Sequence, residues 1–333
     1  TCVVRGAVKL PAVLDSHMVI QRDQPVRIWG WAEAGEEVTV TLAEETQKTV
    51  ADGAGQWLVE LDSQEADGKP RQTKVVGKNT IDLEDVLVGE VWIGSGQSNM
   101  EWQLKNTTGA EQAIAAADHA DVRLFHVPKV QADKIADDVN AKWKACTPEN
   151  VATFSAVLYY FGKRLHDDLN VPIGLINSSW GGSPIEPWTI KNGISGGMYN
   201  GMIAPLTNVA VKGAIWYQGE TNVINKNGLS YADKMTDLIQ GWRKEFRNDH
   251  LAFHFVQIAP WSGERYEPGQ LPALWEAQVA TLKIPHPGMA VTTDLVDNIA
   301  DIHPRNKQDV GNRLALWALA GTYGRRGMTY SGP

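Results

Sequence analysis

Ser98 has the surroundings that a nucleophilic serine requires. It follows a stretch that starts with apolar and β-branched residues and breaks at two glycines, VWIGSGQ (residues 91–97). This pattern predicts a buried strand, a sharp turn and the first turn of a helix. Backbone N–H groups at a helix start can stabilise an anion, so Ser98 could attack a carbonyl carbon there. The competing interpretation is an ordinary polar turn in which Ser98 caps the helix.

A serine nucleophile needs a base, and His303 is the candidate for that role. It follows the last expected strand, so it could reach the same sheet edge as Ser98, and an imidazole pKa suits proton transfer in both directions. Asp301 could orient the ring, because residues i and i+2 of an extended segment point the same way. Asp294, Asp297 or a backbone carbonyl could do so instead, and Asp301 is also typical of a carboxylate at a helix N-terminus.

Groups that follow two other expected strands could hold the oxyanion of such a reaction. Gly181 and Gly182 lie in a turn that could expose bare backbone N–H groups, and Gln218 offers a side-chain amide. With the N–H of Ser98 they would make a hole of three donors, each worth roughly 10²–10³ in rate. Taken separately, the glycines also fit a tight turn, and Gln218 fits a polar loop that satisfies its own backbone.

These residues must be positioned by a sheet, and from Val86 onward expected strands alternate with expected helices. This alternation predicts a parallel, doubly wound α/β sheet, in which ligands bind at the carboxyl ends of the strands. The strands are expected at Val91–Gly94, Val122–His126, Ile173–Asn177, Gly213–Tyr217, Ala252–Ile258 and Met289–Thr293, and the helices at Ala110–Ala117, Thr153–Leu169, Tyr231–Arg247, Ala273–Leu282 and Asn306–Gly321.

Residues 1 to 85 follow a different pattern, with short alternating strands separated by turn residues. Strands are expected around Val19–Ile20, Val26–Trp31, Glu37–Leu42 and Gln56–Leu61. They predict a small antiparallel β-sandwich without a cluster of titratable residues. Its expected role is structural packing beside the second domain, with carbohydrate binding as the more specific alternative.

Composition excludes several classes of function. The chain has 333 residues, a net charge of −8 and 43% hydrophobic residues, which predicts a globular protein with a well-buried core. An acidic chain without a basic block is a poor candidate for binding nucleic acid or an anionic membrane, and no apolar run approaches the roughly 20 residues of a membrane span.

Cys2 and Cys146 do not have metal-ligand or redox spacing, and no two histidines stand with a carboxylate at ligand spacing, so neither metal nor cofactor is predicted. The absence of a starting methionine and of a signal peptide fits a processed, secreted or periplasmic chain, and it also fits a chain that was shortened at its start.

Four motifs together resemble the sialate O-acetylesterase family of the SGNH (GDSL-like) hydrolases. They are GQSNM (96–100), SWGGSPIE (179–186), WYQGETN (216–222) and DIHPRNKQ (301–308), and the similarity extends over nearly the whole chain. The resemblance implies a flavodoxin-like three-layer α/β/α catalytic domain at residues 86–333, beside a small β-sandwich domain at residues 1–85. It also implies a metal-independent serine esterase that acts on O-acetylated carbohydrate, either sialic acids or plant polysaccharides such as acetylated xylan.

Carried over to this chain, the resemblance makes Ser98 the nucleophile, His303 the base, and Gly181 or Gly182 the donor of the second motif. At the third motif the wider superfamily has an asparagine donor, and here Gln218 is preferred, with Asn222 as the rival. The wider superfamily also has an aspartate three positions before the histidine. Position 300 is alanine in this chain, and Asp301 lies one residue closer.

The remaining expectations concern the substrate and the ends of the chain. Four tryptophans are expected at the sugar-facing wall with Glu220 as a polar substrate contact: Trp102, Trp180, Trp188 and Trp261. Because relatives generally continue into further β structure, a catalytic domain truncated at its C-terminus is expected. A non-catalytic carbohydrate-binding protein on the same scaffold is the alternative function. The sequence does not indicate an oligomeric state.

Overall fold

A parallel sheet forms the centre of the part of the chain that the computed structural model describes, residues 7–328 and 330. The strand order is β15–β14–β13–β7–β10–β8–β9, and every neighbouring pair is parallel except β8 and β9. The bounds are β7 (Thr80–Gly96), β8 (His119–His126), β9 (Trp143–Cys146), β10 (Ile173–Ser179), β13 (Gly213–Tyr217), β14 (Ala252–Val256) and β15 (Pro287–Ala290). All six strands expected for this sheet are present. Five of them lie within a few residues of the expected ends, whereas β7 begins at Thr80 and not at the expected Val91, because its first half pairs with β6 in the N-terminal part.

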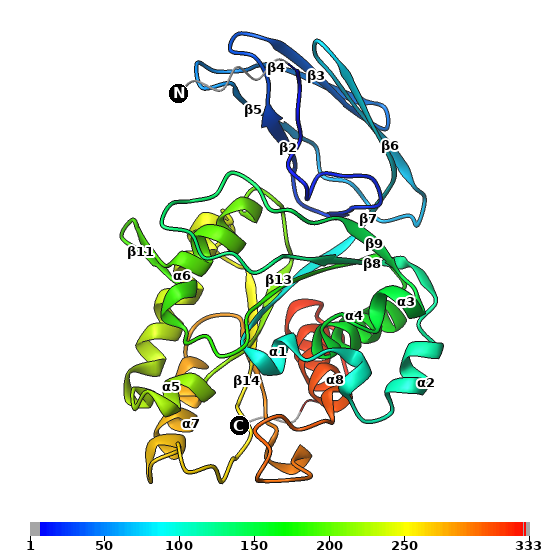
Figure 1. Ribbon diagram of the computed structural model, residues 1–333. Coiled ribbons are helices and arrows are strands. Elements are labelled where there is room, and N and C mark those ends of the chain that lie inside the picture. Colours follow the sequence, from blue (N-terminus) through cyan, green and yellow to red (C-terminus); the bar gives the residue numbers. More distant parts are fainter. Residues whose placement is uncertain (1–6, 329, 331–333) are drawn as a thin grey trace.

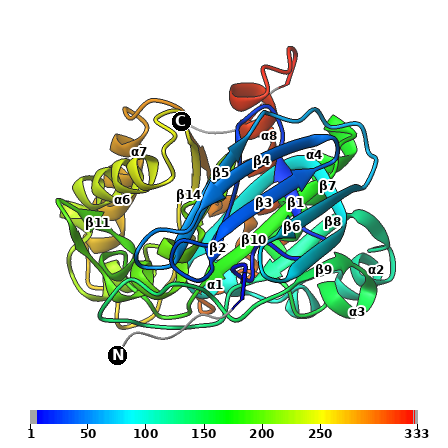
Figure 2. The same ribbon diagram turned by 90° about the horizontal axis from the view of Figure 1, so that it is seen from above.

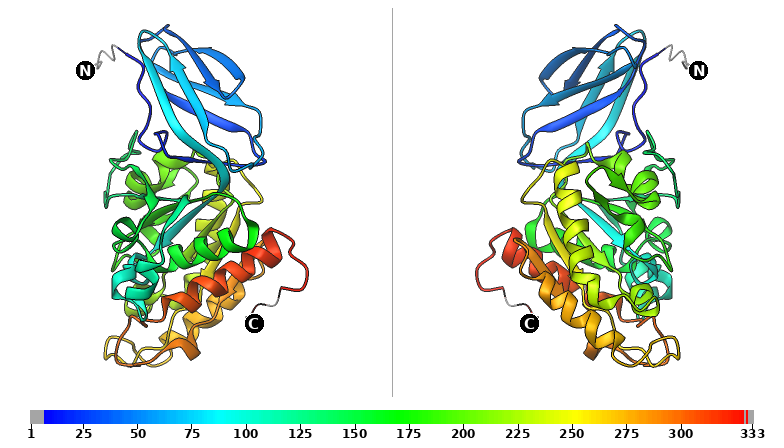
Figure 3. Two further views of the ribbon diagram at one scale, coloured as in Figure 1. Left: turned by 90° about the vertical axis from the view of Figure 1, so that its right-hand side faces the viewer. Right: turned by 90° about the vertical axis from the view of Figure 1, so that its left-hand side faces the viewer.

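Helices cover both faces of this sheet (Figures 1 and 3). On one face α4 (Ala156–Leu169) packs beside α8 (Lys307–Trp317), and on the other α6 (Tyr231–Glu245) lies beside α7 (Gln270–Thr281). Shorter helices follow strands or lie at the edge: α1 (Ser98–Glu101), α2 (Ala110–Ala115), α3 (Pro148–Val151) and α5 (Glu220–Ile224). The expected three-layer α/β/α domain is confirmed.

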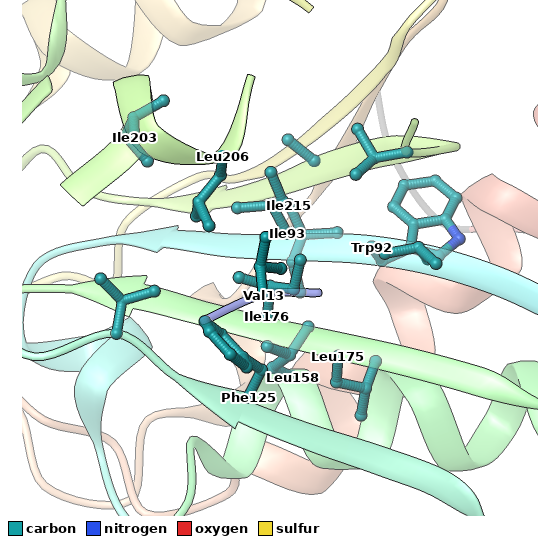
Figure 4. Packing of buried hydrophobic residues seen from close by; sticks show 14 of the residues in the cluster. Val13, Trp92, Ile93, Phe125, Leu158, Leu175, Ile176, Ile203, Leu206 and Ile215 are labelled. Atoms are coloured by element: carbon teal, nitrogen blue, oxygen red, sulfur yellow. The ribbon is translucent and has the colours of Figure 1, made fainter. Parts of the chain in front are cut away.

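The core between these layers is made of aliphatic and aromatic side chains from the central strands. Ile93, Ile176 and Ile215 come from β7, β10 and β13 and are fully buried, and Leu158 of α4 packs over the sheet beside them (Figure 4). Removing such side chains from water supplies roughly 1.5–3 kcal/mol each and fixes the strands that carry the polar residues at their ends.

A second, all-β part precedes this domain, as expected. In it β3 (Glu37–Leu42) pairs with β4 (Glu45–Val50) and β6 (Arg71–Val76), while β2 (Val26–Trp31) pairs with β5 (Gln56–Leu61). These strands lie over one end of the central sheet (Figure 2). Strand β4 was not expected because its sequence ETQKTV has a single apolar residue and faces solvent.

The 17-residue strand β7 belongs to both parts of the molecule. Its first half pairs with β6, and its second half pairs with β10 and β13 at the centre of the parallel sheet. The short strand β1 (Val19–Gln21) also pairs with β7, in parallel. The expected domain boundary, between residues 85 and 86, therefore falls inside a continuous strand, and no linker separates the two parts.

The structure describes one of the two cysteines, Cys146, which is buried and free. Cys2 and residues 331–333 lie outside the described residues. Among the described residues, no helix is both long enough and apolar enough to cross a membrane.

Candidate active site

The turn after β7 carries the first functional side chain and is held by the strands on both sides. The N–H of Gln97 donates to the carbonyl of Tyr217 at 3.0 Å, and the N–H of Trp180 donates to the carbonyl of Gly96 at 3.0 Å. Gly96 has a φ of 132°, and a Cβ on it would lie 2.2 Å from the Tyr217 oxygen. Only glycine fits this position, and the tight turn places Ser98 as the first residue of α1 at the carboxyl edge of the sheet.

The structure brings Ser98 and His303 together from positions 205 residues apart. The Oγ of Ser98 lies 2.9 Å from Nε2 of His303, which is hydrogen-bond distance. The indole of Trp102 stacks on the imidazole, with ring centroids 4.8 Å apart and 20° between the planes. A serine hydroxyl, a histidine and a ring that fixes the histidine plane therefore meet at one point of the sheet edge.

Asp301 is the nearest carboxylate to this histidine. Its Oδ1 accepts a hydrogen bond from the backbone N–H of His303 at 2.9 Å and lies 3.6 Å from Nδ1 of the ring. The rival Asp294 is bound by the two terminal guanidinium nitrogens of Arg313. Burial lowers the pKa of His303 below 6.5, and Lys307 lowers it further, while Asp301 opposes this shift. The neutral imidazole, which can accept a proton, is favoured.

The two glycines of the second motif differ in what their N–H groups do. The N–H of Gly181 donates to Oε2 of Glu101 at 2.6 Å, so the expectation that it is a free oxyanion donor is corrected. Gly182 is exposed, has a φ of 78°, and no described residue accepts from its N–H. Ser98 is the first residue of α1, so its own N–H has no acceptor within the helix.

The expected amide donors of the third motif are directed into the protein instead. Gln218 is fully buried, and its Nε2 lies within hydrogen-bond distance of Oε1 of Gln97, the carbonyl of Ser183 and Oδ1 of Asn222. Asn222 is also fully buried, and its Nδ2 is bound by Glu186 and Asn227. Neither amide has a free N–H for an oxyanion, which corrects both expectations. The two side chains connect the turns after β10 and β13.

Gln97 is a polar group that the sequence analysis did not single out. Its Oε1 accepts from the backbone N–H groups of Gly219 and Thr221, at 3.4 and 3.2 Å, and from Gln218. Because these backbone donors fix which end of the amide is oxygen, the Nε2 group is left without an acceptor among the described residues. The sequence could have indicated a role for Gln97 at the site, because it directly precedes Ser98.

The residues expected at the sugar-facing wall divide into two groups. Trp102, Trp180 and Trp261 are partly exposed, and the Nε1 of Trp261 donates to the carbonyl of Ala300. Trp188 and Glu220 are buried, so the structure corrects their expected contact with substrate. Trp188 belongs to the core, where its Nε1 donates to Ser183.

Metal chemistry would need a set of ligands near these residues. Within the described part of the chain, no group of three or more histidine, cysteine, aspartate or glutamate side chains could hold an ion.

Comparison with protein families gives a match over most of the larger domain. The family model described as carbohydrate esterase, sialic acid-specific acetylesterase matches residues 88–319. The sialate O-acetylesterase of Homo sapiens is 33% identical over 382 residues, which covers 98% of this chain and 73% of the human protein. The Mus musculus sialate O-acetylesterase is 29% identical over 408 residues, covering 98% of this chain and 75% of the mouse protein.

Solved structures show the same similarity in three dimensions. The crystal structure of a carbohydrate acetylesterase from Xanthomonas citri superimposes with a TM-score of 0.92 at 40% identity, covering 98% of this chain and 78% of that one. A protein from Arabidopsis thaliana superimposes with a TM-score of 0.51 at 20% identity, over 71% of this chain and 98% of that one, and shares the fold.

Proposed function

This chain belongs to the sialic acid-specific acetylesterase family of carbohydrate esterases, and we propose that it hydrolyses acetyl esters on sialic acids through an acetyl-serine intermediate. That it is a carboxylic-ester hydrolase acting on acetylated carbohydrate follows from the family match and the similar acetylesterases. The identity of the sugar and the serine mechanism are the proposal. The 2.9 Å contact between Ser98 and His303 is the observation that supports the mechanism most directly.

In the first half of the reaction, Nε2 of His303 takes the proton of Ser98 as Oγ attacks the acetyl carbonyl carbon. The tetrahedral intermediate collapses when the sugar oxygen leaves with the proton from the imidazolium, and the acetyl group stays on Ser98. In the second half, His303 takes a proton from water, which attacks the acetyl carbon. Acetate leaves as Ser98 recovers its proton. The Asp301 carboxylate accepts from the backbone N–H of His303, which fixes the backbone that carries the ring, and it stabilises the imidazolium from 3.6 Å.

Three donors without acceptors among the described residues support a hole for the oxyanion: the N–H groups of Ser98 and Gly182 and the Nε2 of Gln97. Each such donor is worth roughly 10²–10³ in rate. In this proposal Gln97 replaces Gln218 and Asn222, because their amide N–H groups already have acceptors inside the protein.

The sugar would lie against the partly exposed indoles of Trp102, Trp180 and Trp261, which offer flat apolar faces. A sialic acid is proposed ahead of xylan because the matching family model and the curated relatives carry sialic acid in their descriptions. A secreted or periplasmic location remains part of the proposal.

Acetate release from a panel of substrates tests the proposal. Wild-type protein and Ser98→Ala are compared on O-acetylated sialic acid, acetylxylan and para-nitrophenyl acetate. We expect the highest kcat/KM on O-acetylated sialic acid, and no release above background by Ser98→Ala on any of the three.

The two parts of the proposal fail separately. A higher kcat/KM on acetylxylan would overturn the sugar assignment and leave the mechanism standing. Near-wild-type turnover by correctly folded Ser98→Ala would overturn the mechanism.

A further inference from the structure

Hydrogen bonds join three buried polar side chains next to Ser98 and the His303 loop. Asn99, Glu220 and Lys307 come from α1, α5 and α8, and each is almost completely shielded from solvent. Charged side chains rarely occupy such positions unless they are paired, so their placement calls for an explanation. None of the three can touch a substrate, because none reaches the surface.

Asn99 connects the other two and also reaches the loop that carries the catalytic base. Its Nδ2 donates to Oε1 of Glu220 at 2.6 Å and to the backbone carbonyl of Ile302 at 3.1 Å. Its Oδ1 accepts from Nζ of Lys307 at 2.5 Å. Both hydrogens and the oxygen of one amide are thereby used, and the donor and acceptor ends are set by a carbonyl and an ammonium group.

These contacts join the two segments that must meet for catalysis. Asn99 is the residue after Ser98, Ile302 is the residue before His303, and Lys307 begins the helix that follows the His303 loop. By contrast, Asp301 binds within the His303 loop itself. Among the contacts that the structure describes, the Asn99 amide is thus a direct link between the nucleophile helix and the histidine loop.

We propose that Asn99, held between Glu220 and Lys307, is a positioning residue for the hydrolysis: it fixes the His303 loop at the distance from Ser98 at which the imidazole can take the proton. The inference rests on the proposed function, since it assigns His303 as the base. Losing the amide would let the loop shift, and a misplacement of about 1 Å can cost about 10²-fold in rate.

Lys307 has a second consequence for the same histidine. Its Nζ lies over the ring of Trp102, at 5.9 Å, and the same indole stacks on the imidazole of His303. The charged groups that act on His303 are Lys307 from α8 and Asp301 from its own loop. Those that act on Lys307 are Glu220, Asp301 and Asp297. A positive charge on Lys307 therefore opposes a second positive charge on the imidazole.

The titration of the cluster is consistent with this arrangement. Burial lowers the pKa of Lys307 to about 7, against the opposing pull of Glu220. Burial raises the pKa of Glu220, whose Oε2 has no partner among the described residues. Below pH 7, where His303 would take up its proton, Lys307 carries its charge and resists that protonation.

Asn99→Ala tests the positioning role, and two Lys307 variants test the effect of the Lys307 charge on His303. Asn99→Ala removes the link, and we expect kcat on O-acetylated sialic acid to fall by about 10²-fold with KM unchanged. Lys307→Met removes the charge, and we expect the acid limb of kcat/KM to move to higher pH, while Lys307→Arg, which keeps the charge, leaves the limb near the wild-type position. A purely structural role would lower the unfolding temperature of Lys307→Met without moving this limb.

A measurement independent of turnover keeps the test decisive. The pKa of the His303 ring is followed by NMR in wild type and Lys307→Met, with His303→Gln used to assign its signal, and a rise in the methionine variant is expected. Asn99→Ala with wild-type kcat would overturn the positioning role, and an unmoved ring pKa in Lys307→Met would overturn the coupling between Lys307 and His303. If Ser98→Ala keeps its activity but the ring pKa shifts, the mechanism is wrong and the coupling between Lys307 and His303 stands. If Lys307→Met does not fold, Asn99→Ala alone decides.

Discussion

At the scale of single residues, the environment of His303 determines the pH range in which this proposed base could accept a proton. The ring is partly buried, stacked on Trp102 and influenced by the nearby Lys307, and both burial and Lys307 lower its pKa. A lowered histidine pKa keeps the ring neutral, and hence basic, to lower pH than usual.

We therefore expect kcat/KM to stay constant through neutral pH and to fall only below the ordinary histidine pKa of about 6.5. The reason is that activity is lost when the free imidazole takes up its proton. A pH–rate profile on para-nitrophenyl acetate measures this directly. An acid limb centred above 6.5 would contradict the environment described for the ring.

Gln97→Glu distinguishes the role of the Gln97 side-chain oxygen from the role of its N–H donor. The oxygen that accepts from Gly219 and Thr221 is retained, while the free N–H donor is replaced by a second oxygen. We expect kcat to fall by about 10²–10³-fold. Because Gln97 is buried, the new carboxylate is also expected to lower the unfolding temperature, so kcat is measured well below that temperature. Gln112→Glu, exposed on α2, adds the same charge elsewhere and is the control. A loss of less than tenfold in Gln97→Glu would remove Gln97 from the oxyanion hole.

The sequence predicted the pairing of Ser98 and His303 because each follows a strand of one parallel sheet, and strand ends meet at an edge. The prediction that the side-chain amide of Gln218 or Asn222 donates to the oxyanion was wrong. Gln218 and Asn222 lie in the expected turn, but their partners are Ser183 and Glu186 from a different turn. Tertiary contacts of this kind decide which end of an amide faces solvent, and they cannot be predicted from the spacing of residues in the sequence.

At the scale of elements, the hydroxyl group of Ser155 couples α1, which carries Ser98, to α4. Ser155 caps α4 by accepting from the N–H of Leu158 at 3.2 Å, and it donates to the carbonyl of Met100 in α1 at 2.6 Å. The side chain is fully buried, so both groups would lose their partner without gaining water.

Ser155→Ala is expected to destabilise the protein by about 1–2 kcal/mol, since it removes a helix cap and leaves buried polar groups unpaired. The midpoint of urea unfolding measures the change. Thr147→Ala is the matched control, because Thr147 caps the four-residue α3 through one longer bond of 3.4 Å. An equal shift in both variants would mean that the contact with α1 contributes nothing.

The elements themselves were largely predictable where the hydrophobic pattern is strong. Strand Gly213–Tyr217 is an apolar run buried on all sides, and its bounds agree with the structure. Strand β6 was not expected because its sequence RQTKVV is mostly polar and is held by pairing with β3 and β7. Pairing of this kind depends on distant strands, which a local pattern does not identify.

At the scale of the whole molecule, β7 joins the N-terminal strands to the catalytic sheet without a break. Near the junction Glu90 is fully buried, and its carboxylate accepts from Arg22 at 2.6 Å and from Gln21 at 2.9 Å. Both partners belong to the N-terminal part of the chain. We therefore expect the two parts to unfold together in one transition.

Glu90→Gln removes the charge that Arg22 binds and places an amide opposite the Gln21 donor. We expect a loss of about 1–3 kcal/mol, because hydrogen bonds to a buried charged group are weakened. Thermal unfolding followed by calorimetry measures both the stability and the number of transitions. Glu37→Gln, which affects the exposed pair with Lys48 at 3.3 Å, is the control and should cost less than about 1 kcal/mol. Two separate transitions in wild type would contradict the shared strand as the source of cooperativity.

The central claim is that Ser98 is the nucleophile and that His303 activates it, and covalent labelling tests it most directly. Wild-type protein and His303→Ala are treated with a serine-reactive organophosphorus ester, and the modified residue is located by peptide mass spectrometry. The account predicts one adduct, on Ser98, which appears as activity is lost and forms far more slowly in the histidine variant. Inactivation without an adduct on Ser98, or full activity after Ser98 is modified, would contradict it.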